Sequence, residues 1–403
     1  MKSFLQVVIV AFLFISFLLS LPNITKERNF KTYADEQLRK TATQKGLKAV
    51  PKSYEELVKV VDNEDNPMTH EKIALGKELF FDTKLSLDNT ISCATCHMIS
   101  KNPDEKKVIL NAITSKKEPN DIKDANNCVI CHLSDESGTD RLSTAIGYKG
   151  ATNPHHLNTM TILNSSLAKY FTWDAEVKTL EKQISNSIQA THKMNLKEEE
   201  LIKKLKLDEK YLAKFDEAFK TKDSLTFINV QKAIAVYVKT LLTRSSFDEF
   251  LEGDNQAIST LTKKGLTNFM NFGCSGCHTG MSVGGQSVQR FPLRQFASIH
   301  DLRPNLGSHF EIIDDTFPFE NKGGYKGRAD TNFFRVPILR NITKTSPYFH
   351  NGSVDKITDA VEIMGKHQVG LNLSNQQIGE IVEFLKTLEG DIVDYTKDKG
   401  VKQ

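Results

Sequence analysis

The chain has 403 residues, of which 39% are hydrophobic and 26% are charged, which is ordinary for a soluble globular protein of two or three domains. Its 53 basic residues nearly balance its 50 acidic residues, so the formal net charge is only +3. A chain without a basic excess gives no reason to expect a nucleic acid partner, and we predict none.

The N-terminus has the pattern of an export signal. A lysine precedes an apolar run from Phe4 to Leu21, and the run ends at Pro22. Its length is on the border between the apolar part of a cleaved signal and a membrane span, and no A-x-A cleavage site follows it. Two interpretations stay open: a cleaved signal, or an uncleaved anchor in which residues 4–21 tether the chain to the inner membrane. Either one predicts a periplasmic location for the body of the chain.

Helical periodicity dominates the rest of the sequence. Residues 22–66 are polar and lysine-rich, which indicates a tether and arm with one helix at Ser53–Asp62. Thr69 can cap the next helix, because apolar residues follow it at helical spacing. The polar stretch Ser100–Asn127 predicts a surface loop with a short helix at Lys106–Ile113.

The second half of the sequence also has helical periodicity, and the sequence has almost no alternating pattern typical of strands. Glycine and proline are frequent between Gly280 and Gly327, which predicts a loop region there. The fold class is therefore mainly α. Further helices are predicted at Glu176–Ala190, Leu196–Lys206, Asp208–Lys220, Thr226–Thr243, Asn255–Asn271, Asp355–Gly365 and Ser374–Leu388.

All six cysteines fall inside three copies of one pattern, C-x-x-C-H, which attaches c-type haem. Two thiols one helical turn apart bond to the vinyl groups of a haem, and the histidine faces its iron. We predict two or three covalently attached haem c groups. The three motifs are Cys93-Ala94-Thr95-Cys96-His97, Cys128-Val129-Ile130-Cys131-His132 and Cys274-Ser275-Gly276-Cys277-His278.

Two other interpretations of the cysteines are zinc and disulfides. The first two cysteine pairs have the ligand spacing of a zinc ribbon. That leaves the pair Cys274 and Cys277 without a second pair, and it does not explain why a histidine follows every pair. Disulfides form in an oxidising compartment, but a bridge within C-x-x-C is more often a redox centre than a structural link. Haem explains the whole pattern best.

Residues 67–390 resemble the bacterial dihaem cytochrome c peroxidases and their methylamine-dehydrogenase-maturing relatives. The resemblance implies two packed cytochrome c-like haem domains and a calcium ion between them. It also implies reduction of hydrogen peroxide to water with electrons from a small cytochrome c or cupredoxin. The residues that carry it are Leu75–Asp82, Ser92–His97, Phe171–Asp174, Arg244–Asp254, Gly273–Gly285, Phe334–Asn341 and Pro347–Val354.

The resemblance divides the chain into segments, and it leaves a homodimer open. An N-terminal haem domain with the peroxide-binding haem precedes a C-terminal domain through which electrons enter. The expected segments are 1–21 (signal or anchor), 22–66 (tether and arm), 67–243 (first haem domain, with an extra motif in an insertion at about 98–132), 244–390 (second haem domain) and 391–403 (tail).

In the C-terminal domain the resemblance implies that Cys274 and Cys277 hold a haem whose iron lies between His278 and Met364. A thioether ligand stabilises reduced iron, so electrons are expected to enter here. The alternative is that Met364 only fills a core. Trp173, the only tryptophan, matches the family's residue between the two haems, although a lone tryptophan is often simply buried.

The same resemblance implies the ligands of the calcium ion. They are Asn158 and the carbonyl groups of Thr345 and Pro347. All are oxygen donors, which calcium prefers.

The N-terminal domain departs from the family, first because it has two C-x-x-C-H motifs. The residues before Cys93 match the family upstream, whereas the spacing after His132 matches it downstream. From this spacing we slightly prefer His132 as the ligand of the peroxide-binding haem, and the haem of His97 is then additional.

The second and third departures concern the groups around the peroxide. Tyr148 stands where many members have a removable histidine ligand, so it leaves the iron open, ligates it as a phenolate or only packs. His155 and His156 follow as other candidate ligands or solvent-exposed loop residues. Lys193 replaces the catalytic glutamate. An ammonium is a poor base at neutral pH, so the adjacent His192 is the predicted acid–base group.

These features predict a periplasmic c-type haem peroxidase with His192, Lys193, Trp173 and Tyr148 near the chemistry. An alternative is an electron-transfer protein of the same fold that has lost peroxide chemistry. Oxidation of a partner protein, as in the maturation relatives, is a third hypothesis. Those relatives lack the methionine ligand, so Met364 argues against it.

Overall fold

The computed structural model describes residues 34–99, 137–293 and 316–395, and they belong to one compact unit. Three sequence predictions lie outside these residues. They are the apolar run Phe4–Leu21, the short helix Lys106–Ile113 and the haem motif Cys128–His132.

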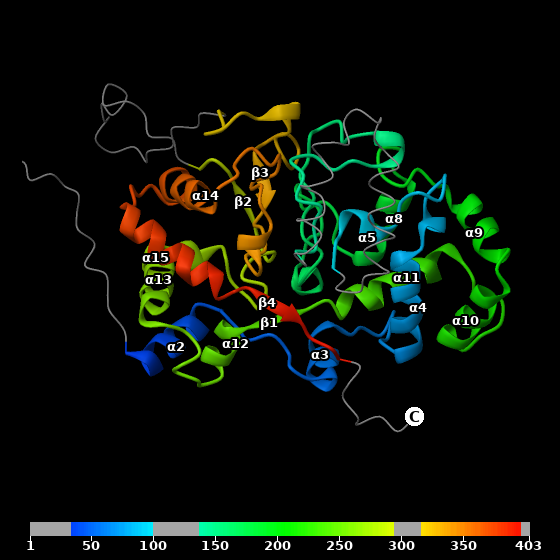
Figure 1. Ribbon diagram of the computed structural model, residues 1–403, viewed down its shortest axis with the longest axis horizontal. Coiled ribbons are helices and arrows are strands. Elements are labelled where there is room, and N and C mark those ends of the chain that lie inside the picture. Colours follow the sequence, from blue (N-terminus) through cyan, green and yellow to red (C-terminus); the bar gives the residue numbers. More distant parts are fainter. Residues whose placement is uncertain (1–33, 100–136, 294–315, 396–403) are drawn as a thin grey trace, which may run out of the picture. The chain divides into compact units, whose positions relative to one another are not determined.

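The described residues are mainly helical, as the sequence predicts, and one group of helices builds an N-terminal core (Figure 1). Thr69 caps the first of them, because its side chain accepts a hydrogen bond from the backbone N–H of Lys72. Thr226 caps the most buried one in the same way. The helices are α4 (His70–Phe81), α8 (Leu180–Gln189), α9 (Glu198–Lys206), α10 (Glu209–Phe219) and α11 (Phe227–Lys239).

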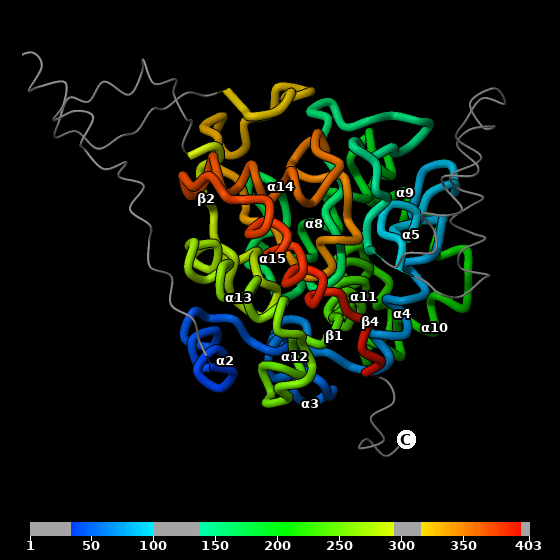
Figure 2. Tube along the Cα trace, turned by 60° about the vertical axis from the view of Figure 1, so that its left-hand side comes forward, coloured from blue at the N-terminus to red at the C-terminus, as the bar shows by residue number. Residues whose placement is uncertain are grey.

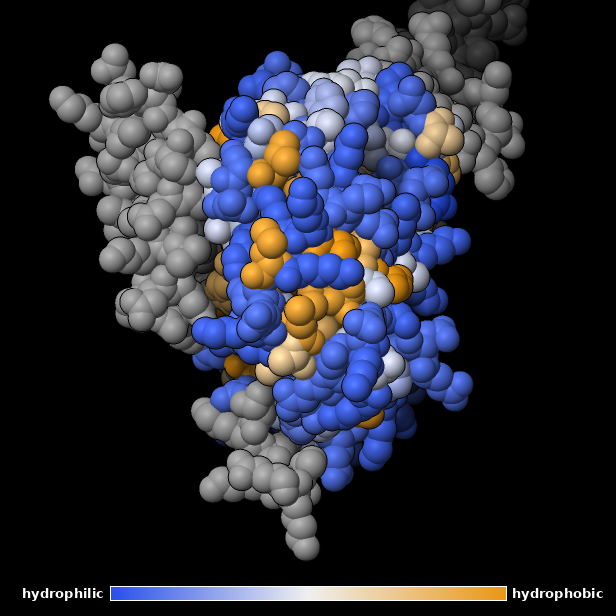
Figure 3. Space-filling model, turned by 90° about the vertical axis from the view of Figure 1, so that its right-hand side faces the viewer, coloured by the Kyte–Doolittle hydropathy of each residue, from blue (hydrophilic) through white to orange (hydrophobic). Residues whose placement is uncertain are grey.

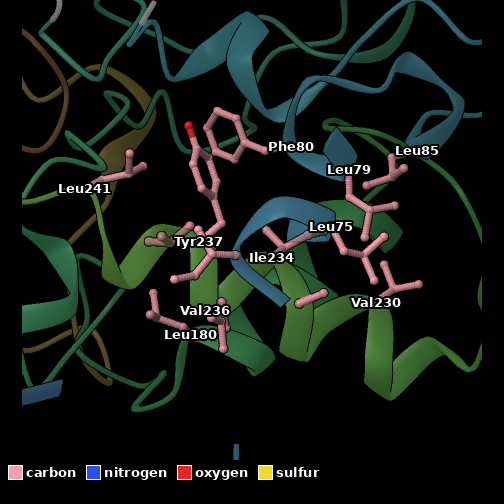
Figure 4. Close-up of a cluster of buried hydrophobic side chains, with 14 of the residues drawn as sticks. Leu75, Leu79, Phe80, Leu85, Leu180, Val230, Ile234, Val236, Tyr237 and Leu241 are labelled. Atoms are coloured by element: carbon pink, nitrogen blue, oxygen red, sulfur yellow. The ribbon is translucent and has the colours of Figure 1, made fainter. Parts of the chain in front are cut away.

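Helices α4 and α11 pack closely in the middle of this core. Figure 4 shows Leu75, Leu79 and Phe80 of α4 beside Ile234 and Tyr237 of α11. Gly76 allows the approach, because a Cβ atom there would lie 2.0 Å from the carbonyl oxygen of Ala233. Any side chain at that position would push the two helices apart.

A second group of helices forms a C-terminal core, again with a glycine at the closest helix contact. A Cβ atom on Gly265 of α13 would lie 1.8 Å from the carbonyl oxygen of Glu380 on α15. Helix α14 (Ile357–Met364) continues into a π-helical turn, Gly365–Val369. The helices of this core are α2 (Asp35–Gln44), α12 (Ser246–Leu251), α13 (Thr260–Asn271) and α15 (Asn375–Lys386).

Strands are few and short in the described part of the chain, as expected from the sequence. β1 (Thr243–Ser245) pairs antiparallel with β4 (Gly390–Ile392). β2 (Val288–Arg290) pairs antiparallel with β3 (Phe333–Arg335). The tube view in Figure 2 shows that β1 and β4 come from distant parts of the sequence.

Residues 34–66 pack against the two cores, whereas the sequence analysis expected a tether and arm. Leu38 of α2 is 1% exposed in the C-terminal core, and Leu57 of α3 (Tyr54–Val61) is fully buried in the N-terminal core. The start of the expected tail is ordered too, since the hydroxyl of Tyr395 donates to the carbonyl of Pro51 at 2.7 Å. The apolar faces of two short amphipathic helices account for this packing.

A buried ion pair fastens the C-terminal core to these first residues. Arg340 and Asp248 are both fully buried, and their side chains form a bidentate pair with N–O distances of 2.8 and 2.6 Å. Asp248 also accepts from the backbone N–H of Val50 at 2.8 Å.

None of the helices in residues 34–99, 137–293 and 316–395 is both long and apolar enough to cross a bilayer. The face shown in Figure 3 is mostly hydrophilic, with an apolar strip across its middle.

Candidate cofactor sites

A largely apolar cavity of about 220 Å³ lies beside the C-terminal core, and we call it the C-terminal cavity. It gathers the residues that the sequence analysis assigned to the second haem. Cys274, Cys277, His278, Met364 and Trp173 all line it. Its apolar walls include Phe269, Phe291, Phe334, Ile338 and Leu385.

The third C-x-x-C-H motif is presented by the end of α13. Gly273 takes φ = 94°, a left-handed conformation that suits glycine, and the chain then enters the 3-10 helix Cys274–Gly276. The backbone N–H of His278 donates to the carbonyl of Cys274 at 3.0 Å, which holds the histidine one turn from the first thiol. The spacing of the motif therefore becomes a fixed arrangement on one cavity wall.

The environment of His278 keeps its imidazole neutral. The side chain is buried, and this burial lowers its pKa to about 4. The carbonyl groups of Val283 and Pro337 lie nearby and oppose the shift, but Nδ1 has no hydrogen-bond partner of good geometry. A neutral, buried imidazole is what a metal requires of a histidine ligand.

The thiols of this motif are not paired with each other. Cys274 and Cys277 are both free, and burial raises the pKa of Cys274 to about 12 and also raises that of Cys277. Zinc needs thiolates, and the described residues contain no cluster of three or more His, Cys, Asp and Glu side chains that would hold a metal. The apolar walls beside these two thiols fit a thioether-bound haem.

Met364, the last residue of α14, lines the same cavity. The helix changes to a π-helical turn directly after it, a distortion that often marks functional sites. Its side chain packs against the aromatic cluster that contains Trp173, Phe291 and Phe334. Both sequence interpretations therefore stay compatible with its position, and the shared cavity with His278 favours ligation.

Trp173 links the two halves of the chain at the cavity wall. Its indole N–H donates to the carbonyl of Asn158 at 3.0 Å, and its own carbonyl accepts from the backbone N–H of Arg335 at 2.8 Å. The predicted calcium ligands Asn158, Thr345 and Pro347 line the same cavity.

The first C-x-x-C-H motif forms a separate site in the N-terminal core, which we call the His97 site. Helix α5 (Cys93–Cys96) carries its two cysteines, which form no disulfide. His97 Nδ1 donates to the carbonyl of Gly138 at 3.1 Å, so Nε2 is the nitrogen left for a metal. Burial lowers the pKa of His97 to about 4; the Gly138 carbonyl opposes this shift, and the charge of Lys193 adds to it.

The carbonyl that orients His97 belongs to the next described stretch, which begins at residue 137. The backbone N–H of Gly138 donates to the carbonyl of Met98 at 2.9 Å. Residues on both sides of the undescribed stretch 100–136 therefore lie at the His97 site. The second motif lies within that stretch.

The structure brings Tyr148, His192 and Lys193 together. The backbone N–H of Tyr148 donates to the carbonyl of Lys193 at 2.7 Å. Gly147 lies so close that a Cβ atom there would be 2.0 Å from the carbonyl oxygen of His192. Lys193 interacts electrostatically with both His97 and Cys96, which places its charge beside the His97 site.

The pKa values of Lys193 and His192 are both lowered. Burial is the main cause for Lys193, and Cys96 opposes it. For His192 the causes are burial, the charge of Lys193 and then His155. Asn153 Nδ2 donates to His192 Nε2 at 3.4 Å, as expected for a neutral imidazole. A neutral histidine beside a lysine of lowered pKa can accept and return a proton.

His155 and His156, the other candidate ligands, are both exposed. The ring of His155 lies 5.3 Å from that of Tyr325, and His156 Nδ1 lies 3.3 Å from the hydroxyl of Thr144. These contacts suit loop residues better than iron ligands.

Two residues of the C-terminal cavity have notable environments that the sequence did not reveal. Arg335 is 3% exposed, and Gln368 has a buried carbonyl oxygen with no hydrogen-bond partner in the described residues. Arg335 lies in the stretch that carries the family resemblance, but nothing in the sequence marks it as buried without an acid.

The chain is similar to known haem peroxidases. The family model for di-haem cytochrome c peroxidase matches residues 70–123 and 121–256. Cytochrome c551 peroxidase of Nitrosomonas europaea is 32% identical over 337 residues, which are 82% of this chain and 83% of the relative. The cytochrome c551 peroxidase of Pseudomonas aeruginosa is 30% identical over 349 residues, which are 85% and 84% of the two chains.

A solved structure supports the fold. The crystal structure of a MauG-like protein associated with microbial copper homeostasis superposes with a TM-score of 0.59 at 22% identity, and the match covers 85% of this chain and 93% of that one. At this identity the similarity concerns the fold alone. The family model and the two peroxidases show that this chain belongs to the di-haem cytochrome c peroxidase family.

Proposed function

We propose that this protein is a periplasmic c-type haem peroxidase, which reduces hydrogen peroxide to water with electrons from a small cytochrome c or cupredoxin. The observation that carries the proposal is the difference between its two described C-x-x-C-H sites. One shares a cavity with a methionine, and the other lies beside Lys193, which follows His192 in the sequence. An electron-accepting site and a proton-transferring site are the two parts that this reaction needs.

The haem groups supply the redox iron, and the protein sets their properties. In the C-terminal cavity, Cys274 and Cys277 would hold the porphyrin, and His278 and Met364 would hold the iron. A thioether ligand favours reduced iron, so electrons from the donor arrive here. Trp173, hydrogen-bonded to residues of both halves, lies on the route to the other site.

For the peroxide-binding haem we assign Cys93, Cys96 and His97. This differs from our preference for His132 from sequence spacing. The hydrogen bond from His97 to Gly138 and the charge of Lys193 beside His97 support the new assignment. The haem of His132 is then the additional one, carried by the insertion.

His192 acts as the acid–base group in this proposal. Cleavage of the peroxide O–O bond requires a proton to leave one oxygen and arrive at the other. The lowered pKa of His192 keeps its imidazole neutral and able to accept that proton near neutral pH. Lys193 contributes positive charge where negative charge develops, and Tyr148 holds Lys193 in place through its backbone N–H.

Steady-state turnover tests the proposal. Purified, fully haem-loaded protein, supplied with a reduced cytochrome c, should oxidise it when hydrogen peroxide is added. Absence of peroxide-dependent oxidation at full haem loading, with cupredoxin tried as a second donor, would disprove the peroxidase assignment.

The second candidate is an electron-transfer protein without peroxide chemistry. Lys193 favours it, since a lysine of lowered pKa beside His97 is itself able to ligate iron in its neutral form. Electron paramagnetic resonance of the oxidised protein separates the two functions. A high-spin, five-coordinate signal supports the peroxidase, whereas only low-spin, six-coordinate signals support the electron carrier.

We also propose that the protein binds a calcium ion and forms a homodimer. Asn158, Thr345 and Pro347 all line the cavity, and the backbone carbonyl of Asn158 accepts a hydrogen bond from the indole of Trp173. A calcium ion there would stiffen the link between the halves, so chelation should slow electron transfer without releasing haem.

A further inference from the structure

Arg335 on β3 is buried without a carboxylate partner. Its side chain is 3% exposed, Nη1 donates to the carbonyl of Tyr170 at 2.9 Å, and Nε has no hydrogen-bond partner in the described residues. Burial alone lowers its pKa to about 10, so no acidic side chain contributes to its environment. A buried guanidinium in this state is costly unless an anion joins it.

Other arginines of the chain show what Arg335 lacks. Arg340, equally buried, forms a bidentate pair with Asp248. Arg328, which is half-exposed, lies 3.6 Å from a carboxylate oxygen of Glu176 and donates to two backbone carbonyls. Arg335 alone among these three has neither solvent nor an acid to offset its charge.

The position of Arg335 indicates where its anion comes from. The guanidinium lines the C-terminal cavity together with Cys274, His278 and Met364. Gln368 lines it too, with a buried carbonyl oxygen that has no partner in the described residues. The remaining wall is mostly apolar. An otherwise apolar cavity with one unpaired cation fits a large apolar ligand that carries a carboxylate.

We propose that Arg335 binds a propionate carboxylate of the haem attached at Cys274 and Cys277, and thereby raises the reduction potential of that haem. The inference rests on the haem of the proposed function, but not on peroxidase activity. Since the backbone N–H of Arg335 also donates to the carbonyl of Trp173, one residue fixes both the carboxylate and the tryptophan segment.

A cation at this position has two physical consequences. It destabilises the additional positive charge of oxidised iron, so the haem is easier to reduce. It also keeps the carboxylate ionised, so the potential does not change with pH across the range in which a free carboxylic acid in an apolar cavity would titrate. The other titratable lining groups stay silent between about pH 5 and 8, because the pKa of His350 is lowered to about 4 and that of Tyr348 is raised to about 12.

The inference is tested by potentiometric titration of the haem attached at Cys274 and Cys277, with the optical spectrum as the readout, at several pH values from about 5 to 8. In Arg335→Gln we expect the reduction equilibrium to shift at least tenfold toward oxidised iron, which is about 59 mV for one electron. The potential should also become pH-dependent. Arg335→Lys keeps the charge, so its potential should lie between those of Arg335→Gln and the wild type. Arg328→Gln is the matched control and should leave the potential unchanged.

Unchanged potentials in Arg335→Gln, or equal shifts in Arg328→Gln, would overturn the inference. The wild-type protein provides a test that needs no variant, because a wild-type potential that changes with pH in this range would also overturn it. The amount of covalently bound haem, measured as the pyridine haemochrome, separates this failure from a failure of the proposed function. Wild-type protein without haem at Cys274 and Cys277 would contradict the proposed function itself.

Discussion

At the scale of single residues, burial keeps three histidines neutral. His97, His278 and His350 each have a pKa lowered to about 4, with burial as the largest cause. The first two belong to C-x-x-C-H motifs, where iron needs an unprotonated nitrogen. His350 belongs to none. Its Nε2 donates to Asn321 Oδ1 at 2.8 Å, and its ring stacks on Phe334 with centroids 4.7 Å apart.

His350 should therefore make stability depend on pH. An unfolded histidine takes up a proton near pH 6.5, but folded His350 resists protonation until about pH 4. Its contribution is fully present above pH 6.5 and is lost as the pH falls to 4, a loss of about 3 kcal/mol in the free energy of unfolding. Guanidinium unfolding at several pH values should show a flatter profile for His350→Gln than for the wild type.

The exposed His156 gives the matched control for this experiment. His156→Gln should keep the wild-type slope, because folding does not bury the side chain of His156. If the free energy of unfolding changes with pH equally in the wild type and in His350→Gln, the proposed role of the burial of His350 is contradicted.

The charge of Lys193 should be visible in the pH dependence of turnover. Lys193 lowers the pKa of His192, so Lys193→Met should raise it and move the acid limb of the rate profile to higher pH. His192→Ala should lower kcat by roughly 10²–10⁴-fold, the usual contribution of a general acid–base group. Steady-state rates with reduced cytochrome c measure both effects.

Lys149 is exposed beside the ring of Tyr148, with its Nζ 5.3 Å from the ring centroid, and makes a matched control. Lys149→Met should leave the profile in place. An acid limb that does not move in Lys193→Met would remove Lys193 from this role.

At the scale of elements, the sequence predicts helices with a regular apolar pattern well, including the eight-residue α3 and α14. Helix α15 was predicted within a few residues, because a hydroxyl cap precedes its apolar face, and Thr69 was correctly predicted as the cap of α4. Helix α12 was missed, since its six residues are too few for a periodic pattern. The packing of α2 was missed because Leu38 and Ala42 are the only apolar residues on a polar helix, and their partners come from distant segments.

In the candidate sites, too, the features contained in a short stretch of sequence were the predictable ones. The cysteines and adjacent histidines were predictable because their chemistry is contained in five consecutive residues. Met364 and Trp173 required the family resemblance, and the structure brings both to the cavity of His278. Arg335 was not predictable, because its lack of an acidic partner exists only after the chain has folded.

The ion pair of Arg340 and Asp248 joins several elements at once, so its loss should destabilise the C-terminal core. Asp248, on α12, binds the backbone of Val50, the end of β1 and Arg340 through its two oxygens. Asp248→Ala leaves a buried arginine unpaired and should cost about 3–5 kcal/mol in the free energy of unfolding. Chemical denaturation measures the cost.

A double variant shows whether this cost comes from the unpaired charge. Arg340→Met combined with Asp248→Leu removes both charges and should recover a large part of the stability. If the double variant is as unstable as the sum of its single changes, the hydrogen bonds to Val50 and Ser245 carry the stability instead.

At the scale of the whole molecule, the two described sites belong to different cores, and Trp173 connects residues of both halves. Its partners are Asn158, which follows the insertion, and Arg335, which lines the C-terminal cavity. Met98 and Gly138, which lie close to the two ends of residues 100–136 outside the described part, are hydrogen-bonded to each other.

This arrangement leads to a prediction for the haem content. Cys128→Ala combined with Cys131→Ala should lower the haem-to-protein ratio by one and leave peroxide turnover largely intact, because the His97 site closes on itself through Met98 and Gly138. Cys93→Ala combined with Cys96→Ala is the matched variant. It should remove one haem as well, but it should abolish turnover, since it takes the iron away from His192 and Lys193. Pyridine haemochrome analysis and steady-state rates measure the two quantities on the same samples. The reverse outcome, turnover lost with the second motif and kept without the first, would return the peroxide to the haem of His132 and make the His97 haem the additional one.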